Sequence, residues 1–102
     1  MVEFQIDWTV EARLDLIDIL DLYIERNGNA YYSKKLNSKI QKSISLISKN
    51  PIIGTQSDQD SVRILTTGDY QLIYKIVNKI ILVVMIWDCR RNPDDKLIGK
   101  RI

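Results

Sequence analysis

The hydrophobic pattern of this 102-residue chain changes its period near residue 60. Upstream of that point, apolar residues mostly recur every three or four positions, which is typical of amphipathic helices. Downstream lie three stretches rich in β-branched and aromatic residues, separated by tight turns, which is typical of neighbouring antiparallel strands. We therefore expect an α+β fold in which a helical hairpin packs on a small antiparallel sheet.

The expected order of elements is βααβββ. Residues 2–7 alternate apolar and polar side chains and predict the first strand. A helix is expected from Val10 to about Arg26, with Thr9 as its N-cap. A second helix follows the turn at residues 27–29 and stops at Pro51.

The second half is expected to begin with a loop, because residues 52–60 show no periodicity. Three strands should follow it, at Val62–Leu65, Tyr70–Ile76 and Ile80–Trp87. The last of these is apolar on both faces, which favours a central position in the sheet. No repeat or linker divides the chain, so residues 1–102 are expected to form a single domain.

Each helix shows one apolar face and one charged face. The first helix has an apolar stripe made of Ala12, Leu16, Ile19, Leu20, Tyr23 and Ile24. Its acidic residues are expected to be a solvated face, and they are Glu11, Asp15, Asp18 and Glu25. The core side of the second helix is assigned to Leu36, Ile40, Ile44 (or Ser43) and Ile47. Its other face carries Lys35, Lys39 and Lys42.

Composition excludes several classes of protein. The longest apolar run, Ile80–Trp87, is too short to span a bilayer, and the N-terminus has no signal-peptide pattern, so we expect a cytoplasmic protein without a membrane partner. Cys89 is the single cysteine and histidine is absent, so neither an internal disulfide nor a zinc site is expected. The sequence indicates no cofactor. Without histidine to activate it, the Cys89 thiol is expected to be inert.

The net charge is only +2, but the charges are unevenly distributed. The charged residues in the range 11–26 are mostly acidic, whereas residues 31–49 contain lysines and no acid, and residues 90–102 are again basic. This asymmetry indicates a polyanionic target or an acidic partner.

Three segments together resemble the RelE/ParE superfamily of toxins from type II toxin–antitoxin systems, which includes plasmid stabilisation proteins. Trp8 begins a W-x-x-x-A-x-x-D-L pattern, and residues 62–74 resemble a basic strand that leads into a G-x-Y hairpin. Residues 86–93 resemble a hydrophobic strand that ends in arginines and a proline. The resemblance covers nearly the whole chain and implies a toxin with a cognate antitoxin encoded nearby.

The resemblance implies two targets for such a toxin. One branch of the superfamily cuts ribosome-bound mRNA without a metal, and it places phosphate-binding cations where this chain has Arg63 and Arg90 or Arg91. The other branch, ParE-like, inhibits DNA gyrase through protein contact. A nontoxic nucleic-acid-binding module is a third alternative, although no RNA-reading or helix-turn-helix motif supports it.

The departures from the nuclease pattern slightly favour gyrase. Gln71 stands where nucleases have an arginine, and the C-terminal tyrosine or histidine of the nucleases is missing. In a ribonuclease, Asp88, Asp94, Tyr70 or a lysine would have to move the protons.

Two sets of candidate site residues follow. The catalytic set, which applies only to a ribonuclease, is Arg63, Arg90, Arg91 and Tyr70. The set for binding the target or the antitoxin is Lys35, Lys39, Lys42, Arg63, Gln71, Lys75, Arg90 and Arg91. An acidic amphipathic segment of the antitoxin would suit these cations.

Overall fold

The computed structural model describes residues 3–102, so Val2, which we included in the first strand, lies outside the described residues. The expected elements are present in the expected order. The helices are α1 (Val10–Asn27) and α2 (Tyr31–Lys49). The strands are β1 (Gln5–Trp8), β2 (Thr55–Gln56), β3 (Val62–Thr67), β4 (Tyr70–Val77) and β5 (Ile80–Asp88). Two short 3-10 turns follow, η1 (Pro93–Asp95) and η2 (Ile98–Lys100).

The sheet is mixed rather than antiparallel throughout, and its strand order is β1-β5-β4-β3-β2. Strands β3 to β5 pair antiparallel, as the tight turns predicted, and β2 also pairs antiparallel with β3. Strand β1 pairs with β5 in parallel, with Gln5 opposite Ile80. The connection from β1 to β5, which a parallel pair requires to be long, runs through the helical hairpin and then through β2, β3 and β4. The central position predicted for the last strand is confirmed, since β5 lies between β1 and β4.

The loop expected at residues 52–60 contains β2, a two-residue strand that adds an edge to the sheet beside β3. A strand this short leaves no periodic pattern in the sequence, because alternation needs at least four residues to be recognised. A second irregularity lies between β4 and β5. There Ile73 pairs with Met85 and Tyr74 with Val83, so Val84 is an extra residue that forms a β-bulge.

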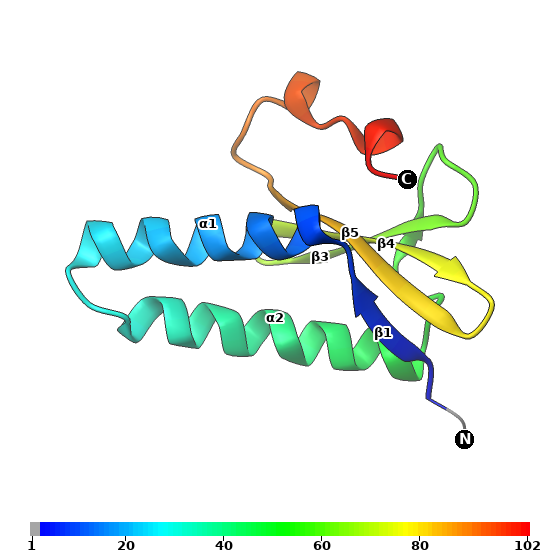
Figure 1. The fold of residues 1–102 in the computed structure, drawn as a ribbon, viewed down its shortest axis with the longest axis horizontal. Coiled ribbons are helices and arrows are strands. Elements are labelled where there is room, and N and C mark those ends of the chain that lie inside the picture. The colour runs from blue at the N-terminus through cyan, green and yellow to red at the C-terminus, as the bar shows by residue number, and fades with distance from the viewer. Residues whose placement is uncertain (1–2) are drawn as a thin grey trace.

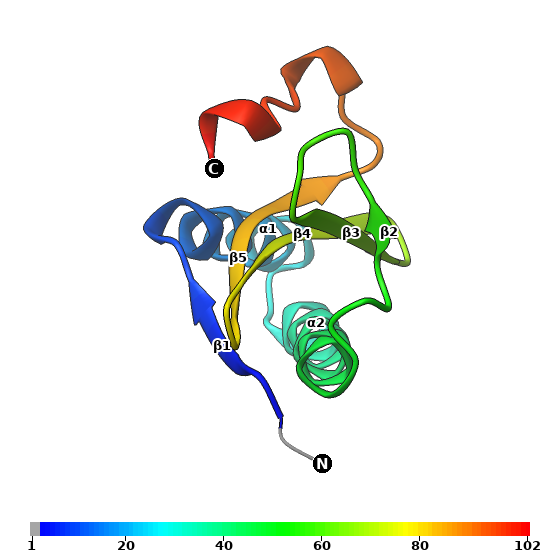
Figure 2. The ribbon, with the colours of Figure 1, turned by 90° about the vertical axis from the view of Figure 1, so that its right-hand side faces the viewer.

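The two faces of the sheet are covered by different parts of the chain. The helices cover one face, where Ala12, Ile40, Tyr74 and Val83 belong to the larger core cluster. The C-terminal segment, residues 89–102, folds back over the opposite face, where Ile98 packs near Trp87 in a second cluster. Figures 1 and 2 show α2 and this segment on opposite sides of the strands. No pattern in residues 89–102 predicted this second layer.

The predicted helix ends and most of the predicted core are confirmed. Thr9 accepts a hydrogen bond from the amide of Ala12, and Gly28 closes α1 in the left-handed conformation at φ 70°. Asn29 accepts a hydrogen bond from the first amide of α2, at Tyr31. The four residues assigned to the core side of α2 are buried, with Ile44 and not Ser43 in the core.

One predicted core residue of α1 is wrong. Ile24 is 38% exposed, because it lies on the outer side of the helix, seven residues after the exposed Ile17. Among residues 3–102, no helix is long and apolar enough to cross a membrane.

Candidate functional site

The end of β5 carries a hydrogen-bonded cluster centred on Arg90, which we call the Arg90 cluster: Tyr23, Tyr70, Asp88 and Arg90. The guanidinium donates to both carboxylate oxygens of Asp88, at 2.9 Å each, and to the hydroxyls of Tyr23 at 2.7 Å and Tyr70 at 3.1 Å. The Tyr70 hydroxyl in turn donates to the Tyr23 hydroxyl at 3.0 Å. The cluster therefore ties α1, β4 and the end of β5 together.

The packing of β4 against β5 explains why these groups meet. Tyr70 opens β4 directly opposite Asp88, and the Asp88 carboxylate also accepts the backbone amide of Arg90, which turns the chain back toward the tyrosines. Tyr23 reaches the same point from the last turns of α1, although its position in the apolar stripe predicted only a core role. A buried tyrosine needs a partner for its hydroxyl, and this requirement was the available sequence signal.

The contacts within the Arg90 cluster shift the pKa values of its members in different directions. Hydrogen bonds from Tyr70 and then Arg90 lower the pKa of Tyr23, because both stabilise its phenolate. Burial, followed by the hydrogen bond to Tyr23, raises the pKa of Tyr70. The hydrogen bond from the Arg90 side chain lowers the pKa of Asp88, and the same contact raises the pKa of Arg90. Arg90 is therefore a permanent cation whose side chain is 51% exposed.

A groove of about 170 Å³ adjoins the cluster between α2 and the β3–β4 turn; we call it the lysine groove. Its lining residues are Tyr32, Lys35, Leu36, Lys39, Thr67, Gly68, Asp69 and Tyr70. Arg90 extends toward its rim, where the guanidinium lies 3.9 Å from the carboxylate of Asp69. The structure thus brings together four of the predicted site residues: Lys35, Lys39, Tyr70 and Arg90. Lys42 is exposed on α2 but does not line this groove.

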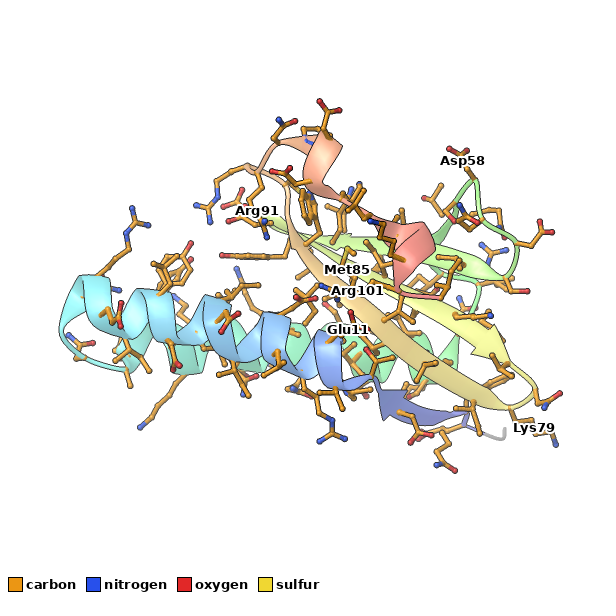
Figure 3. The ribbon with its side chains drawn as sticks, turned by 45° about the horizontal axis from the view of Figure 1, so that its top comes forward. Glu11, Asp58, Lys79, Met85, Arg91 and Arg101 are labelled. Atoms are coloured by element: carbon orange, nitrogen blue, oxygen red, sulfur yellow. The ribbon has the colours of Figure 1, made fainter. Side chains whose placement is uncertain are left out.

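Arg91 forms no hydrogen bond with the tyrosines of the Arg90 cluster among residues 3–102, although it lines a groove together with Asp88. Its guanidinium carbon lies 4.7 Å from the centre of the Trp87 ring, a cation–π contact on the face that the C-terminal segment covers. The groove that Arg91 lines has a volume of about 190 Å³ and lies beside α1, where Asp18 and Leu22 also line it. Figure 3 shows Arg91 at the end of β5 opposite to Lys79. The two consecutive arginines therefore contact different residues, Arg90 the tyrosines of the cluster and Arg91 the ring of Trp87.

Arg63, predicted to bind a phosphate, holds a loop. Its guanidinium donates to the carbonyl of Gly54 at 2.6 Å and to that of Ile52 at 3.4 Å. Arg63 pairs with Tyr74 on β4, four residues from Tyr70, and four residues of a strand span roughly 13 Å. Arg63 therefore lies apart from the Arg90 cluster.

The remaining candidates are dispersed. Gln71 accepts a hydrogen bond from the Lys96 ammonium at 2.8 Å, so a lysine of the C-terminal segment reaches the position where the resemblance expected an arginine. Lys75 is half-buried on β4. Asp94 is exposed in η1, far along the chain from the tyrosines, and Cys89 is an exposed free thiol.

A second network, which sequence reasoning missed, holds the C-terminal segment in place. Arg101 donates to both carboxylate oxygens of Asp15, at 2.8 and 3.1 Å, and to the carbonyl of Val84 at 3.0 Å, and it forms an ion pair with Glu11. Asp15 also accepts the amide of Ile86. Figure 3 shows Glu11 and Arg101 side by side at the start of α1. The expectation that Asp15 belongs to a solvated face is wrong.

This network has a structural explanation. The pairing of β1 with β5 ends at Trp8 and Val83, and the next β5 groups on that edge have no strand beside them. Side chains of Asp15 and Arg101 satisfy them instead, as buried backbone groups require. Asp15 and Arg101 are 86 positions apart in sequence, so no local pattern could reveal their contact.

Chemically, the Arg90 cluster and the lysine groove offer cations, aromatic rings and hydroxyls on a surface made of α1, α2 and the β3–β4 turn. Such a surface suits an anionic or polar partner. Among residues 3–102, no three His, Cys, Asp or Glu side chains are arranged to hold a metal ion.

Two solved structures share this fold. One is titled "Chromosomal ParDE TA system from P. aeruginosa", with 23% identity over 84% of this chain and 96% of that chain, and a TM-score of 0.73. The other is "The crystal structure of the toxin-antitoxin complex RelBE2 (Rv2865-2866) from Mycobacterium tuberculosis", with 16% identity over 85% of this chain and 99% of that chain, and a TM-score of 0.64. A comparison with curated proteins found no match.

The family comparison covers most of the chain. The family described as "ParE toxin of type II toxin-antitoxin system, parDE" matches residues 6–93, from β1 to the start of η1. This confirms the RelE/ParE resemblance carried by Trp8, the β3–β4 hairpin and the end of β5. The chain belongs to the ParE toxin family of type II toxin–antitoxin systems.

Proposed function

We propose that this ParE-family toxin arrests bacterial growth by binding DNA gyrase, and that the Arg90 cluster and the lysine groove form the contact surface. The observation that carries the proposal is the Arg90 cluster itself. Its guanidinium is fixed by Asp88 and two tyrosines, yet half of its side chain remains exposed. A preorganised arginine beside aromatic rings is a common anchor of protein interfaces.

The same contacts argue against RNA cleavage. A metal-free ribonuclease must deprotonate a hydroxyl and protonate a leaving oxygen, and each step needs a group that can reach the substrate. Tyr23 is 9% exposed, and its oxygen already accepts hydrogen bonds from Tyr70 and Arg90. Arg63, which would neutralise the phosphorane, donates to loop carbonyls instead.

One observation favours the ribonuclease alternative. The lowered pKa of Tyr23 and the raised pKa of Tyr70 would suit a base and an acid. In that mechanism Arg90 would stabilise the charge on the phosphate. RNA cleavage is therefore the competing outcome of the test below.

The proposal includes a cognate antitoxin that covers the same surface. The similar ParDE and RelBE2 structures are described as a toxin–antitoxin system and a toxin–antitoxin complex, which supports such a partner for this chain. Helix α2 carries five lysines and no acid, so an acidic amphipathic segment would complement it. Antitoxin binding at Arg90 and the lysine groove would then block the contact with the target.

The deciding experiment uses purified toxin, refolded after removal from its antitoxin. A gyrase supercoiling assay is run beside primer extension on ribosome-bound mRNA. Inhibited supercoiling with intact mRNA is the expected result, and ribosome-dependent cleavage with normal supercoiling would overturn the proposal. Arg90→Ala should weaken inhibition at least about tenfold, whereas Lys79→Ala, at the opposite end of β5, should not change it.

A further inference from the structure

Helix α1 has a second apolar stripe on its outer side, opposite the core. The stripe consists of Val10, Leu14, Ile17 and Ile24, which are 73%, 52%, 50% and 38% exposed. Their spacing of four, three and seven positions places them on one line along the helix, in the pattern of a coiled-coil seam. Asp21 occupies the remaining seam position between Ile17 and Ile24.

Acidic residues follow one flank of this stripe. Glu11, Asp18 and Glu25 recur every seventh position, next to the seam, where side chains set the choice of a partner helix. Glu11 forms an ion pair with Arg101, but Asp18, Asp21 and Glu25 form no ion pair with any residue in the range 3–102. On the other flank, Arg13 lines a groove of about 360 Å³ together with Ile17 of the stripe and Gln41 of α2.

Pairing with a second copy of α1 is unfavourable in either direction. In a parallel pair, equivalent seam residues meet, so two Asp21 carboxylates would face each other in an apolar interface. In an antiparallel pair, the same flank of each helix faces the other, so Asp18 and Glu25 would meet acidic residues of the second copy. The residues of this face therefore disfavour a homodimer.

We infer that the outer face of α1 docks an amphipathic helix of another protein, whose apolar seam is flanked by lysine or arginine. A cation opposite Asp21 would complete the match, because a seam charge specifies register through its partner. This surface is separate from the Arg90 cluster and the lysine groove, which attract acidic groups. The toxin thus has two helix-borne surfaces of opposite charge, one on α1 and one on α2.

The test uses a synthetic amphipathic peptide of about three heptads, made with either lysine or glutamate at its flanking positions. Each peptide carries a fluorescent label, and its affinity for the full-length toxin is measured by anisotropy. We expect the lysine peptide to bind at least about tenfold more tightly than the glutamate peptide. Equal affinities, or no binding of either peptide, would overturn the inference.

Variants of the toxin locate the site. Leu14→Glu/Ile17→Glu should abolish binding, while Leu46→Glu/Ile52→Glu, at apolar residues of similar exposure outside α1, should leave it unchanged. Circular dichroism and melting temperature must match the wild type in both.

Charge reversal keeps the test decisive even if the Leu14/Ile17 variant misfolds. Asp18→Lys/Asp21→Lys/Glu25→Lys should invert the preference between the two peptides. Unchanged preference would contradict the inference. Self-association of the wild-type toxin through α1, measured by analytical ultracentrifugation with the Leu14/Ile17 variant as control, would also contradict it.

Discussion

The Asp88 carboxylate makes more contacts with Arg90 than any other group in the Arg90 cluster, and it should make stability depend on pH. Its pKa is lowered by the Arg90 hydrogen bonds, so its contribution is fully present above the pKa of the unfolded chain, at pH about 4. The contribution is lost as the pH falls through the lower pKa of the folded state. Because Arg90 is half exposed, solvent screening limits the contribution to about 1 kcal/mol.

We therefore expect Asp88→Asn to lower the free energy of unfolding by about 1 kcal/mol at neutral pH and by much less in strong acid. Urea denaturation at both pH values checks this. Asp94→Asn, an exposed aspartate outside the cluster, is the matched control. A loss of equal size at both pH values would show that the effect is not electrostatic.

Gly54 is required by a close approach of two chain segments. A Cβ atom there would lie 2.7 Å from the Tyr74 hydroxyl oxygen and 3.0 Å from the Ile64 carbonyl. That hydroxyl also donates to Pro51 and accepts the Gly54 amide, so it cannot move without breaking both hydrogen bonds. The loop between α2 and β3 is consequently fixed to β4 at this point.

Gly54→Ala should therefore destabilise the protein by about 1–3 kcal/mol, as overpacking does. Thermal unfolding of the purified variant measures this loss of stability. Gly99→Ala is the control, because its added Cβ would meet only the Gln59 amide nitrogen, at 3.8 Å. Equal melting temperatures for the two variants would mean that the loop shifts to accommodate the added methyl group.

At the scale of elements, the C-terminal segment depends on Arg101. Truncation of this side chain would leave the Val84 carbonyl without its side-chain donor and the Asp15 carboxylate with the Ile86 amide alone, and a buried group left unsatisfied typically costs about 1–3 kcal/mol. Arg101→Ala should lower the melting temperature and speed hydrogen exchange in residues 89–102. Lys100→Ala, an exposed neighbour, should do neither. Unchanged exchange in Arg101→Ala would show that the other contacts of the segment, such as those of Ile98 and Lys96, are sufficient to hold it.

Elements that rest on local signals were predictable from the sequence. Thr9 and Gly28 mark the ends of α1, and the β3–β4–β5 meander follows from its tight turns. The parallel direction of β1 was not predictable, because the alternation in residues 2–7 is the same for both directions. The short strand β2 also lacked a signal.

The candidate site was predictable only in part, for a similar reason. Lys35, Lys39, Tyr70 and Arg90 have chemical character that marks them in the sequence, and they do converge. Tyr23 was hidden in the apolar stripe of α1. Its role depends on a contact between residues 67 positions apart, which no pattern of neighbouring residues encodes.

At the scale of the whole molecule, the charges on α2 should govern how fast partners associate. Long-range attraction raises the association rate and is screened by salt, whose Debye length is roughly 10 Å at 0.1 M. The association rate with an acidic antitoxin should therefore fall as salt rises. Lys35→Gln/Lys39→Gln/Lys42→Gln should reduce both the rate at low salt and its salt dependence.

Stopped-flow or surface-plasmon measurements at low and high salt distinguish a loss of electrostatic attraction from a loss of contacts. Steering changes the association rate, whereas lost contacts mainly change the dissociation rate. Lys79→Gln/Lys100→Gln, at two exposed lysines in the β4–β5 turn and in η2, is the control for a general loss of positive charge. An unchanged association rate in the triple variant would place the antitoxin elsewhere.

The parallel pairing of Gln5 with Ile80 also determines when the sheet can be completed during synthesis of the chain. Strand β1 is synthesised first but has no neighbour until β5 leaves the ribosome. At about 5–20 residues per second, synthesis of the first 80 residues takes on the order of 4–16 s. Throughout that interval the sheet lacks β5, the strand between β1 and β4, and the Arg90 cluster cannot form. The Arg90 cluster can therefore form only when translation is nearly finished, because Arg90 is the 90th of 102 residues.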